Sequence, residues 1–377
     1  MVRVLVDASD ITNLSGSRTA VYELYDAVFR LKSDWNFVVL VSQVEEGFSK
    51  YPWVKQICIP YGNRLLQRVF IQLVILRYDL SRRIDVVHFS RSIGGITINA
   101  KNVLSVFDIT PLIYPKYYPK STYLYWKCLA PFLFPYTNKI VAISQTVKSD
   151  LIRYYPGIDN NKVDVVYCAP KSTLLSKPRA IEVKQVRLKY GLPDEYLLYL
   201  GILARKKNLP TLVDALFLLK KRCVRFPPLV VAGGIYRKSD DYRALMDTIS
   251  RKNMERDILV VGPVHDNDLA ALLHGAFIFL YPSLHEGFGI PCLEAMACGV
   301  PVITTNSGAI PEVVGDAAIL VQNPLDSELF ADAICALLND PQLRRTLIER
   351  GLKRARNFSW TSSAKRLIEI FESIVQG

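Results

Sequence analysis

Two glutamates in the C-terminal half of the chain, Glu286 and Glu294, flank a loop that contains glycines and leads into a helix-like segment. Gly287 and Gly289 let the backbone approach a ligand closely. Pro291 suits the first position of a helix, which places Glu294 in the first turn. Free amides and the positive end of the helix dipole suit a diphosphate. We expect Glu286 to meet sugar hydroxyls and Glu294 a ribose diol. Alternatively, Glu294 only balances the dipole and the glycines only form a turn.

Three consecutive cations, Arg205, Lys206 and Lys207, lie in a second loop of the same half. The loop follows the strand-like segment 197–201 and precedes a helix expected to start near Leu209. Cations at a helix entrance suit a leaving diphosphate, although many such runs are solvated turns. Lys207 is the first candidate for this contact with the diphosphate, and Arg205 is the second.

Other patterns limit the chemistry. Asp266-Asn267-Asp268 could suggest a metal-dependent transferase, but it directly precedes the helix-like segment 269–274, so we expect helix capping. The seven cysteines are scattered and include no C-x-x-C pair, which predicts free thiols in a reducing, cytoplasmic compartment. Cys292 and Cys298 are expected in the core. No G-x-G-x-x-G follows the first strand, which weakens a dehydrogenase hypothesis. We therefore expect neither a metal nor a cofactor.

Short apolar runs alternate with helix-length amphipathic stretches in both halves. Runs that are apolar on both faces suit parallel strands covered by helices, so the alternation predicts doubly wound α/β sheets. The expected strands are 2–6, 37–41, 86–89, 103–107 and 140–143, then 197–201, 229–232, 258–261, 277–281 and 302–304. The length of 377 residues suits two domains. The linker is expected at 169–180 and the last helix at 362–375.

The segment 282–297 resembles the E-x7-E signature of the retaining family-4 glycosyltransferases of the GT-B fold. The resemblance continues through 299–302 and 308–314, is strong from about residue 197 to 360, and is weak before that. It implies two facing Rossmann-like domains with a C-terminal helix crossing back. The implied divisions are 1–172 on the acceptor side, 173–360 binding the nucleotide sugar, and 361–377 as the returning helix.

The resemblance also implies roles for single residues. Glu286 contacts the donor sugar and Glu294 the nucleotide ribose, while the loop contributes Phe288, Gly289 and Ile290. Lys207 fits the family lysine. Ile202 stands where an arginine usually follows the glycine, so Arg205 or Lys206 is expected in that role. The remaining expected site residues are Gly201, Val264, Asp108, Gly16 and Ser17.

The N-terminal half departs further from the family pattern. Phe107, before Asp108, replaces a histidine that family members often carry near the reacting sugar. The turn 15–18, which could approach the donor phosphates, has fewer glycines than usual. His88 lies on another predicted strand and is expected to be structural.

By this resemblance the chain transfers a sugar from a nucleoside-diphosphate sugar with retention and without a metal. Relatives with Arg-Lys-Asn at the basic turn are often bacterial mannosyltransferases of surface-polysaccharide assembly. This favours GDP-mannose as donor over a UDP-sugar, and a growing glycan on a lipid-diphosphate carrier as acceptor. Because Phe107 and Ile202 depart from the family, a non-catalytic nucleotide- or glycan-binding protein remains an alternative. A sugar-nucleotide epimerase on the same fold is a third hypothesis.

The formal net charge of +12 favours an anionic partner, and no nucleic-acid-binding module is found. No apolar run is long enough to span a membrane, and the N-terminus does not read as a signal peptide.

Segment 64–83 has five arginines against Asp79, and the stretch 114–136 combines lysines with aromatic residues. Either could dock on an anionic membrane surface, and either could instead be ordinary packing. In segment 64–83 one helical face is formed by Leu66, Val69, Phe70, Leu73, Leu76 and Leu80. The expected location is the cytoplasm, peripheral to the inner face of the membrane.

Overall fold

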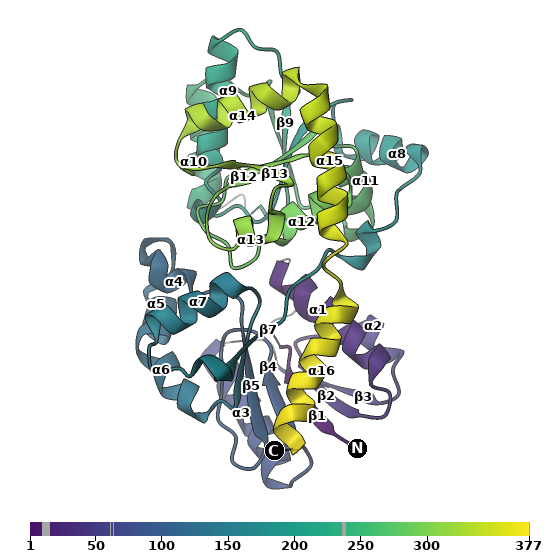
Figure 1. Cartoon of the computed structure of the whole chain (residues 1–377), viewed down its shortest axis with the longest axis vertical. Helices are drawn as coiled ribbons and strands as arrows, with labels where there is room; N and C mark the ends of the chain where they lie inside the picture. Colours follow the sequence, from purple (N-terminus) through teal and green to yellow (C-terminus); the bar gives the residue numbers. More distant parts are fainter. Residues whose placement is uncertain (10–15, 61, 63, 236–238, 377) are drawn as a thin grey trace. The chain divides into compact units, whose positions relative to one another are not determined.

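The computed structural model describes residues 1–376 except 10–15, 61, 63 and 236–238. Its internal contacts divide the chain into two compact units (Figure 1). Unit 1 comprises Met1–Ala169 and Ser359–Gly377, and unit 2 comprises Pro170–Phe358. The domain boundaries expected from sequence, after residues 172 and 360, lie three and two residues beyond those of the units.

Unit 1 is built on a seven-stranded parallel sheet with the order β3-β2-β1-β4-β5-β6-β7. The central strand β4 is buried along its whole length because helices cover both faces of the sheet. The sequence does not predict the edge strands β3 and β7, because β3 is only partly buried and β7 has three residues. The strands are β1 Arg3–Asp7, β2 Asn36–Val41, β3 Val54–Cys58, β4 Val86–Phe89, β5 Lys101–Val106, β6 Lys139–Ala142 and β7 Val163–Val165.

Right-handed crossovers place α1 and α2 on one face of this sheet and α3 to α7 on the other. The helix α16 returns to the first of these faces, beside α1 (Figure 1). There Phe371 stacks on Trp35 at 6.4 Å between ring centroids, and Lys32 Nζ lies 2.6 Å from Glu372 Oε1. The helices are α1 Gly16–Leu31, α2 Glu46–Ser49, α3 Arg64–Leu80, α4 Thr110–Ile113, α5 Lys120–Leu124, α6 Ala130–Leu133, α7 Gln145–Tyr154 and α16 Trp360–Gln376, with the π-helical turn η2 Tyr125–Leu129 between α5 and α6.

Unit 2 is built on a six-stranded parallel sheet with the order β10-β9-β8-β11-β12-β13. Its strands are β8 Leu197–Leu200, β9 Leu229–Ala232, β10 Ile258–Gly262, β11 Ile278–Tyr281, β12 Val302–Thr305 and the unpredicted edge strand β13 Ala318–Val321. Its helices are α8 Ala180–Tyr190, α9 Leu209–Lys221, α10 Asp240–Arg251, α11 Leu269–His274, α12 Ile290–Ala297, α13 Ile310–Val314, α14 Ser327–Asn339 and α15 Pro341–Ala355. Each unit is thus a doubly wound, Rossmann-like α/β domain, as the alternation of runs predicts.

None of the described helices combines the length and hydropathy of a membrane-crossing segment.

Candidate active site

Three loops of unit 2 follow the neighbouring strands β8, β11 and β12 at the carboxyl edge of the sheet. They are residues 201–208, 282–289 and 306–309. The strand order reverses between β8 and β11, and doubly wound sheets bind ligands at such a switch point. Backbone bonds tie the loops together: Leu284 N–H donates to the Lys206 carbonyl at 2.8 Å, and Ala309 N–H to the Glu286 carbonyl at 2.9 Å. The chain therefore builds one site from segments about 100 residues apart in sequence.

Lys207 and Glu286 form a buried ion pair across the first two loops. Lys207 Nζ lies 2.5 Å from Glu286 Oε1, and the side chains are 12% and 11% exposed. The same oxygen accepts hydrogen bonds from Ser283 Oγ at 2.5 Å and from the Tyr281 hydroxyl at 3.1 Å. Lys207 also donates to the Tyr281 hydroxyl oxygen and lies over the tyrosine ring. The sequence singles out both Lys207 and Glu286, and the structure brings them into direct contact.

This arrangement fixes the protonation state of Glu286. Burial raises the pKa of the carboxyl group, but the charges of Lys207 and Lys206, with hydrogen bonds from Lys207 and Ser283, outweigh it and lower the pKa to about 2. Burial, followed by the negative charge of Glu286, raises the pKa of Tyr281 well above its usual value. At neutral pH the site therefore holds a carboxylate, and Tyr281 keeps its proton.

Sequence reasoning misses Tyr281 and Ser283. Tyr281 ends β11 and is 1% exposed, so in sequence it resembles the apolar end of a buried strand. Ser283 lies two residues further on and is completely buried. The available signal is two hydroxyl groups just before Glu286, at the end of a strand, where parallel sheets bind ligands.

Helix α12 begins one residue earlier than the sequence predicts. Gly289, with a φ of 97°, takes the N-cap position, so Ile290 is the first helical residue and Pro291 the second. Glu294 is therefore the fifth residue, and the expectation that it lies in the first turn is wrong. The reason is the left-handed conformation of Gly289, which ends the loop and frees Ile290 to start the helix. Glu294 is 7% exposed.

The apolar side chains of the predicted donor loop belong to the core of unit 2. Phe288 is 2% exposed and packs edge-on against Phe358 at 5.7 Å between ring centroids. Ile290 is 8% exposed. These side chains hold the loop in place, so a ligand would meet its backbone. Cys292 and Cys298 are buried, as the sequence predicts.

The other predicted residues of unit 2 occupy varied positions. Arg205 is turned toward α10, with Nε 3.1 Å from Asp241 Oδ1, and its side chain is 65% exposed. Lys206 acts on Glu286 through its charge. Gly201 lies so close to Gly233 that a Cβ on Gly233 would be 2.3 Å from the Gly201 carbonyl oxygen. The half-buried Val264 follows β10, two strands from β8.

The D-x-D pattern does not cap a helix through its side chains. Asp268 occupies the N-cap position of α11 without a side-chain capping bond. It instead accepts hydrogen bonds from Lys189 Nζ at 2.6 Å and the Tyr190 hydroxyl at 2.7 Å. Asp266 pairs with Lys171 at 2.8 Å. The capping prediction is wrong because nearby cationic and hydroxyl donors satisfy these carboxylates.

The predicted site residues of the N-terminal half all lie in unit 1. Gly16 is the exposed first residue of α1, followed by the half-buried Ser17. Of the expected turn 15–18, residue 15 lies outside the described residues, and the other three residues form the start of α1. Asp108 is half-buried beyond the end of β5, and its Oδ1 accepts a hydrogen bond from Thr110 N–H at 3.2 Å.

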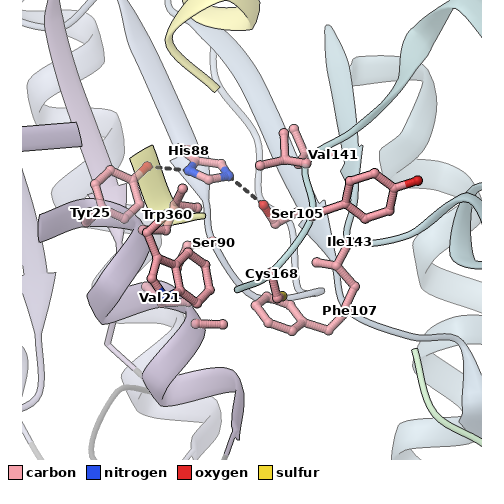
Figure 2. A pocket seen from close by; sticks show the side chains of 14 residues that line it. Val21, Tyr25, His88, Ser90, Ser105, Phe107, Val141, Ile143, Cys168 and Trp360 are labelled. Atoms are coloured by element: carbon pink, nitrogen blue, oxygen red, sulfur yellow. Dashed lines mark hydrogen bonds between the residues drawn. The ribbon is translucent and has the colours of Figure 1, made fainter. Parts of the chain in front are cut away.

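A small cavity of about 20 Å³ lies in unit 1 between α1, the carboxyl ends of β4 and β5, and Trp360, and Figure 2 shows its lining. Phe107, the residue that replaces the family histidine, lines it. At its side the fully buried His88 is hydrogen-bonded to the Tyr25 hydroxyl and, at 2.8 Å, to Ser105 Oγ (Figure 2). Burial lowers the pKa of His88 to about 3. A neutral imidazole held on both nitrogens agrees with the structural role expected for His88.

Comparison with known proteins places this geometry in a family. Residues 182–354, inside unit 2, match the model of "Glycosyl transferases group 1". The O-antigen chain mannosyltransferase B of Escherichia coli is 34% identical over 273 residues, which cover 72% of this chain and 70% of that protein. The serotype-specific mannosyltransferase WbdA of Escherichia coli is 29% identical over 294 residues, 76% of this chain. The chain spans about a third of WbdA, 35% of its length.

Among solved structures, WaaG, a glycosyltransferase involved in lipopolysaccharide biosynthesis, superposes with a TM-score of 0.78 over 98% of this chain and 99% of WaaG. At 16% identity this likeness concerns the fold alone. The matched model contains both Lys207 and Glu286, and the identity with mannosyltransferase B extends over most of both chains. The chain therefore belongs to the group 1 glycosyl transferases, that is, to the family-4 glycosyltransferases of the GT-B fold.

Proposed function

We propose that the protein transfers mannose from GDP-mannose, with retention of anomeric configuration, to a growing glycan on a lipid-diphosphate carrier. The observation that carries the proposal is the buried Lys207–Glu286 pair at the switch point of unit 2. The choice of mannose rests on the names of the relatives, an O-antigen chain mannosyltransferase and a serotype-specific mannosyltransferase. Lipid-linked growth of the glycan is the acceptor chemistry that the sequence resemblance favours.

The donor fits the site as follows. All three described hydrogen bonds to the Glu286 carboxylate converge on Oε1, so we assign Oε2 to a hydroxyl of the donor sugar. The diphosphate lies against Lys207, Lys206 and the first amides of α12, where the helix dipole favours negative charge. Glu294, on α12, accepts from the ribose diol. Arg205 can contact the diphosphate only if its ion pair with Asp241 breaks.

Transfer then needs stabilisation of the departing nucleotide. The bond between the anomeric carbon and the phosphate oxygen breaks, and the acceptor hydroxyl attacks on the same face. Its proton passes to an oxygen of the leaving phosphate. Lys207 and Lys206 stabilise the negative charge that develops on GDP, which is the role such preorganised cations fill in a buried site. This route requires neither a metal nor Glu286 as a covalent nucleophile. We place the reaction at the cytoplasmic face of the membrane, where the free thiols of all seven cysteines would persist.

The experiment is a thermal-shift panel with GDP-mannose, GDP, UDP-glucose and UDP. A ligand that binds only the folded chain raises its midpoint of unfolding, by an amount that grows with concentration over Kd. The proposal predicts the largest shift with GDP-mannose, a smaller one with GDP, and little with the uridine nucleotides. Glu286→Gln, which keeps the size of the side chain, should reduce the difference between GDP-mannose and GDP. A larger shift with a UDP-sugar would overturn the assignment of the donor.

A further inference from the structure

Helix α3 carries an apolar stripe that packing on the sheet does not use. Its buried side chains Ile71, Ile75 and Asp79 recur every four residues and face the core. A second stripe points away from the core, and its side chains are 41% to 69% exposed. It consists of Leu66, Val69, Phe70, Leu73 and Leu80. Packing on the sheet therefore explains only one side of the helix, and the apolar face noted in the sequence lies on the other.

The exposed apolar surface continues beyond α3. The Gln72 side chain makes two hydrogen bonds with the backbone of Ile96. Gln72 Nε2 donates to the Ile96 carbonyl oxygen at 2.7 Å, and the Ile96 N–H donates to Gln72 Oε1 at 3.2 Å. Gly94 N–H in turn donates to the Tyr125 hydroxyl of the π-helical turn η2 at 3.2 Å. Ile96 and Ile98 are 50% and 64% exposed. The stripe, this loop and the helices α5 to α6 thus follow one another on one face of the sheet of unit 1.

The last part of this surface lies on η2 and α6 and the turn that follows. Leu129, Phe132 and Tyr136 are 52%, 72% and 67% exposed. Tyrosine and other aromatic side chains are favoured at the boundary between lipid headgroups and acyl chains. We call the exposed apolar residues of α3, of loop 93–98 and of 124–136 the apolar face of unit 1.

The charge of the chain is concentrated in the same region. Residues 47–149 contain fourteen Lys and Arg against three Asp, a formal charge of +11 out of +12 for the whole chain. Asp79 is completely buried and accepts the backbone N–H groups of residues 98–100, and Asp85 is paired with Arg3. Six exposed cations of this region form no ion pair among the residues that the structure describes. They are Arg77, Arg82, Arg83, Lys116, Lys120 and Lys127.

We propose that the apolar face of unit 1 docks on an anionic lipid bilayer, with its apolar side chains in the interface and its cations on lipid phosphates. Apolar and cationic groups on one surface suit such a bilayer. A nucleic acid would leave the apolar stripe in water. A second copy of this chain would bring two cation-rich surfaces together, and like charges oppose such a symmetric contact. The inference goes beyond the proposed function, because it stands whichever sugar the site in unit 2 transfers.

Docking by this face also has a geometric consequence within unit 1. Arg68 Nη1, in the second turn of α3, lies 2.9 Å from Asp7 Oδ2 at the carboxyl end of β1. The first turns of the lipid-facing helix therefore lie at the carboxyl edge of the sheet, the edge at which ligands of such sheets bind. An acceptor carried by a lipid would reach this edge without leaving the bilayer.

The test is co-sedimentation of the full chain with vesicles of phosphatidylcholine alone and of phosphatidylcholine with phosphatidylglycerol, at low and high salt. The proposal predicts recovery only on the anionic vesicles, decreasing with salt because screening shortens the reach of the charges. Arg82→Gln with Arg83→Gln should lower the partition coefficient roughly five-fold for each arginine. Leu66→Gln with Leu73→Gln should remove most of the binding that survives high salt.

The matched control is Leu188→Gln with Leu325→Gln, two leucines of unit 2 that are 75% and 66% exposed. This control should bind vesicles like the unmodified chain, and all variants should keep its circular dichroism and its thermal shift with GDP-mannose. Equal recovery on both vesicle types, or none on either, would overturn the proposal. So would equal losses in the control and in the α3 variants. If Leu66→Gln with Leu73→Gln instead abolished a lipid-free dimer in analytical ultracentrifugation, the face would be an interface between copies and the proposal wrong.

Discussion

At Glu286 burial and charge act in opposite directions, and the outcome determines what the residue can do. A buried carboxyl without partners would take up a proton, but Lys207, Ser283 and Tyr281 all donate to Oε1. The group stays ionised, with a pKa of about 2, so it is a hydrogen-bond acceptor and not a proton donor at neutral pH. This suits recognition of a sugar hydroxyl.

Lys207→Ala should reduce turnover by about a hundred-fold or more, because one preorganised contact to the developing charge is lost. The variant should also be less stable by about 3–5 kcal/mol, since it leaves Glu286 buried without its ion partner. Steady-state kinetics and urea unfolding measure the two effects.

The double variant Lys207→Ala with Glu286→Gln separates stability from chemistry. Removing the unpaired charge should restore part of the stability and none of the turnover. Lys220→Ala, which breaks the more exposed pair with Asp257 at the other end of α9, is the control and should keep normal turnover. Near-normal turnover in Lys207→Ala would show that the lysine only neutralises Glu286.

Glu294→Ala should weaken nucleotide binding by about 1.5–3 kcal/mol, the contribution of one charge-assisted hydrogen bond. The fold should survive, because α12 keeps its start at Gly289 and Ile290. Isothermal titration with GDP measures the loss, and unchanged affinity would remove Glu294 from the ribose site.

The buried His88 should make unit 1 sensitive to mild acid. Its folded pKa of about 3 lies below its ordinary value of 6.5, so below pH 6.5 the unfolded chain binds a proton that the folded chain does not. Stability is therefore complete above pH 6.5 and is lost as the pH falls, by about 2 kcal/mol at pH 5. Urea unfolding at pH 7 and pH 5 measures this change. The His88→Gln variant, whose side chain can still bond Tyr25 and Ser105, should show a much smaller change in stability between pH 7 and pH 5. An equal change in the variant and the unmodified chain would contradict this account.

At the scale of elements, the site depends on how closely loop 306–309 packs on loop 282–289. Gly308 has a φ of 57°, and a Cβ there would lie 2.4 Å from the Glu286 carbonyl oxygen. Gly308→Ala should therefore displace the loop that carries Glu286 and weaken donor binding as well as stability. Gly191→Ala is the control, because Gly191 has a φ of 63° but nothing within 4 Å of its Cβ position. It should lose about 1–2 kcal/mol of stability from backbone strain and keep its thermal shift with GDP-mannose. Equal effects of both variants on donor binding would show that the close contact has no role.

The elements that the sequence predicts are those whose signal is local. The strands β4 and β9 are buried on both faces and predicted with their full bounds, because β9 is a continuous apolar run and β4 is interrupted only by His88. The edge strand β3 is half-exposed and lacks such a run. The edge strand β13 is a run of only four apolar residues, and three of them are half-exposed. The start of α12 is missed by one residue, because the conformation of Gly289 depends on its surroundings and not on its identity alone.

Within the site, the residues that the sequence predicts belong to short motifs. Which residues they contact cannot be predicted from those motifs. Glu286 and Lys207 are each marked by neighbouring residues. The contact between them joins loops about 80 residues apart and needs the strand order β8-β11 to be known. The same holds for Asp268, whose partner Lys189 lies 79 residues away and replaces the capping role inferred from local sequence.

At the scale of the molecule, charge and chemistry are divided between the two units. Unit 2 contains the family match and the Lys207–Glu286 pair, whereas residues 47–149 of unit 1 carry almost all of the net charge. Unit 1 includes both ends of the chain, because α16 returns to pack beside α1. The division predicts that substitutions on the apolar face of unit 1 change vesicle binding without changing donor binding, and that substitutions at Glu286 do the reverse.

The most direct test of the proposed function is release of GDP from GDP-mannose by the full chain, with and without an oligomannose linked to polyprenyl diphosphate. The account predicts GDP release only in the presence of this acceptor, in equal amount to the mannose transferred, with the new bond in the configuration of the donor by NMR. Binding of GDP-mannose without acceptor-dependent release of GDP would contradict it and indicate a binding protein. Conversion of the donor to another sugar nucleotide without acceptor would indicate an epimerase.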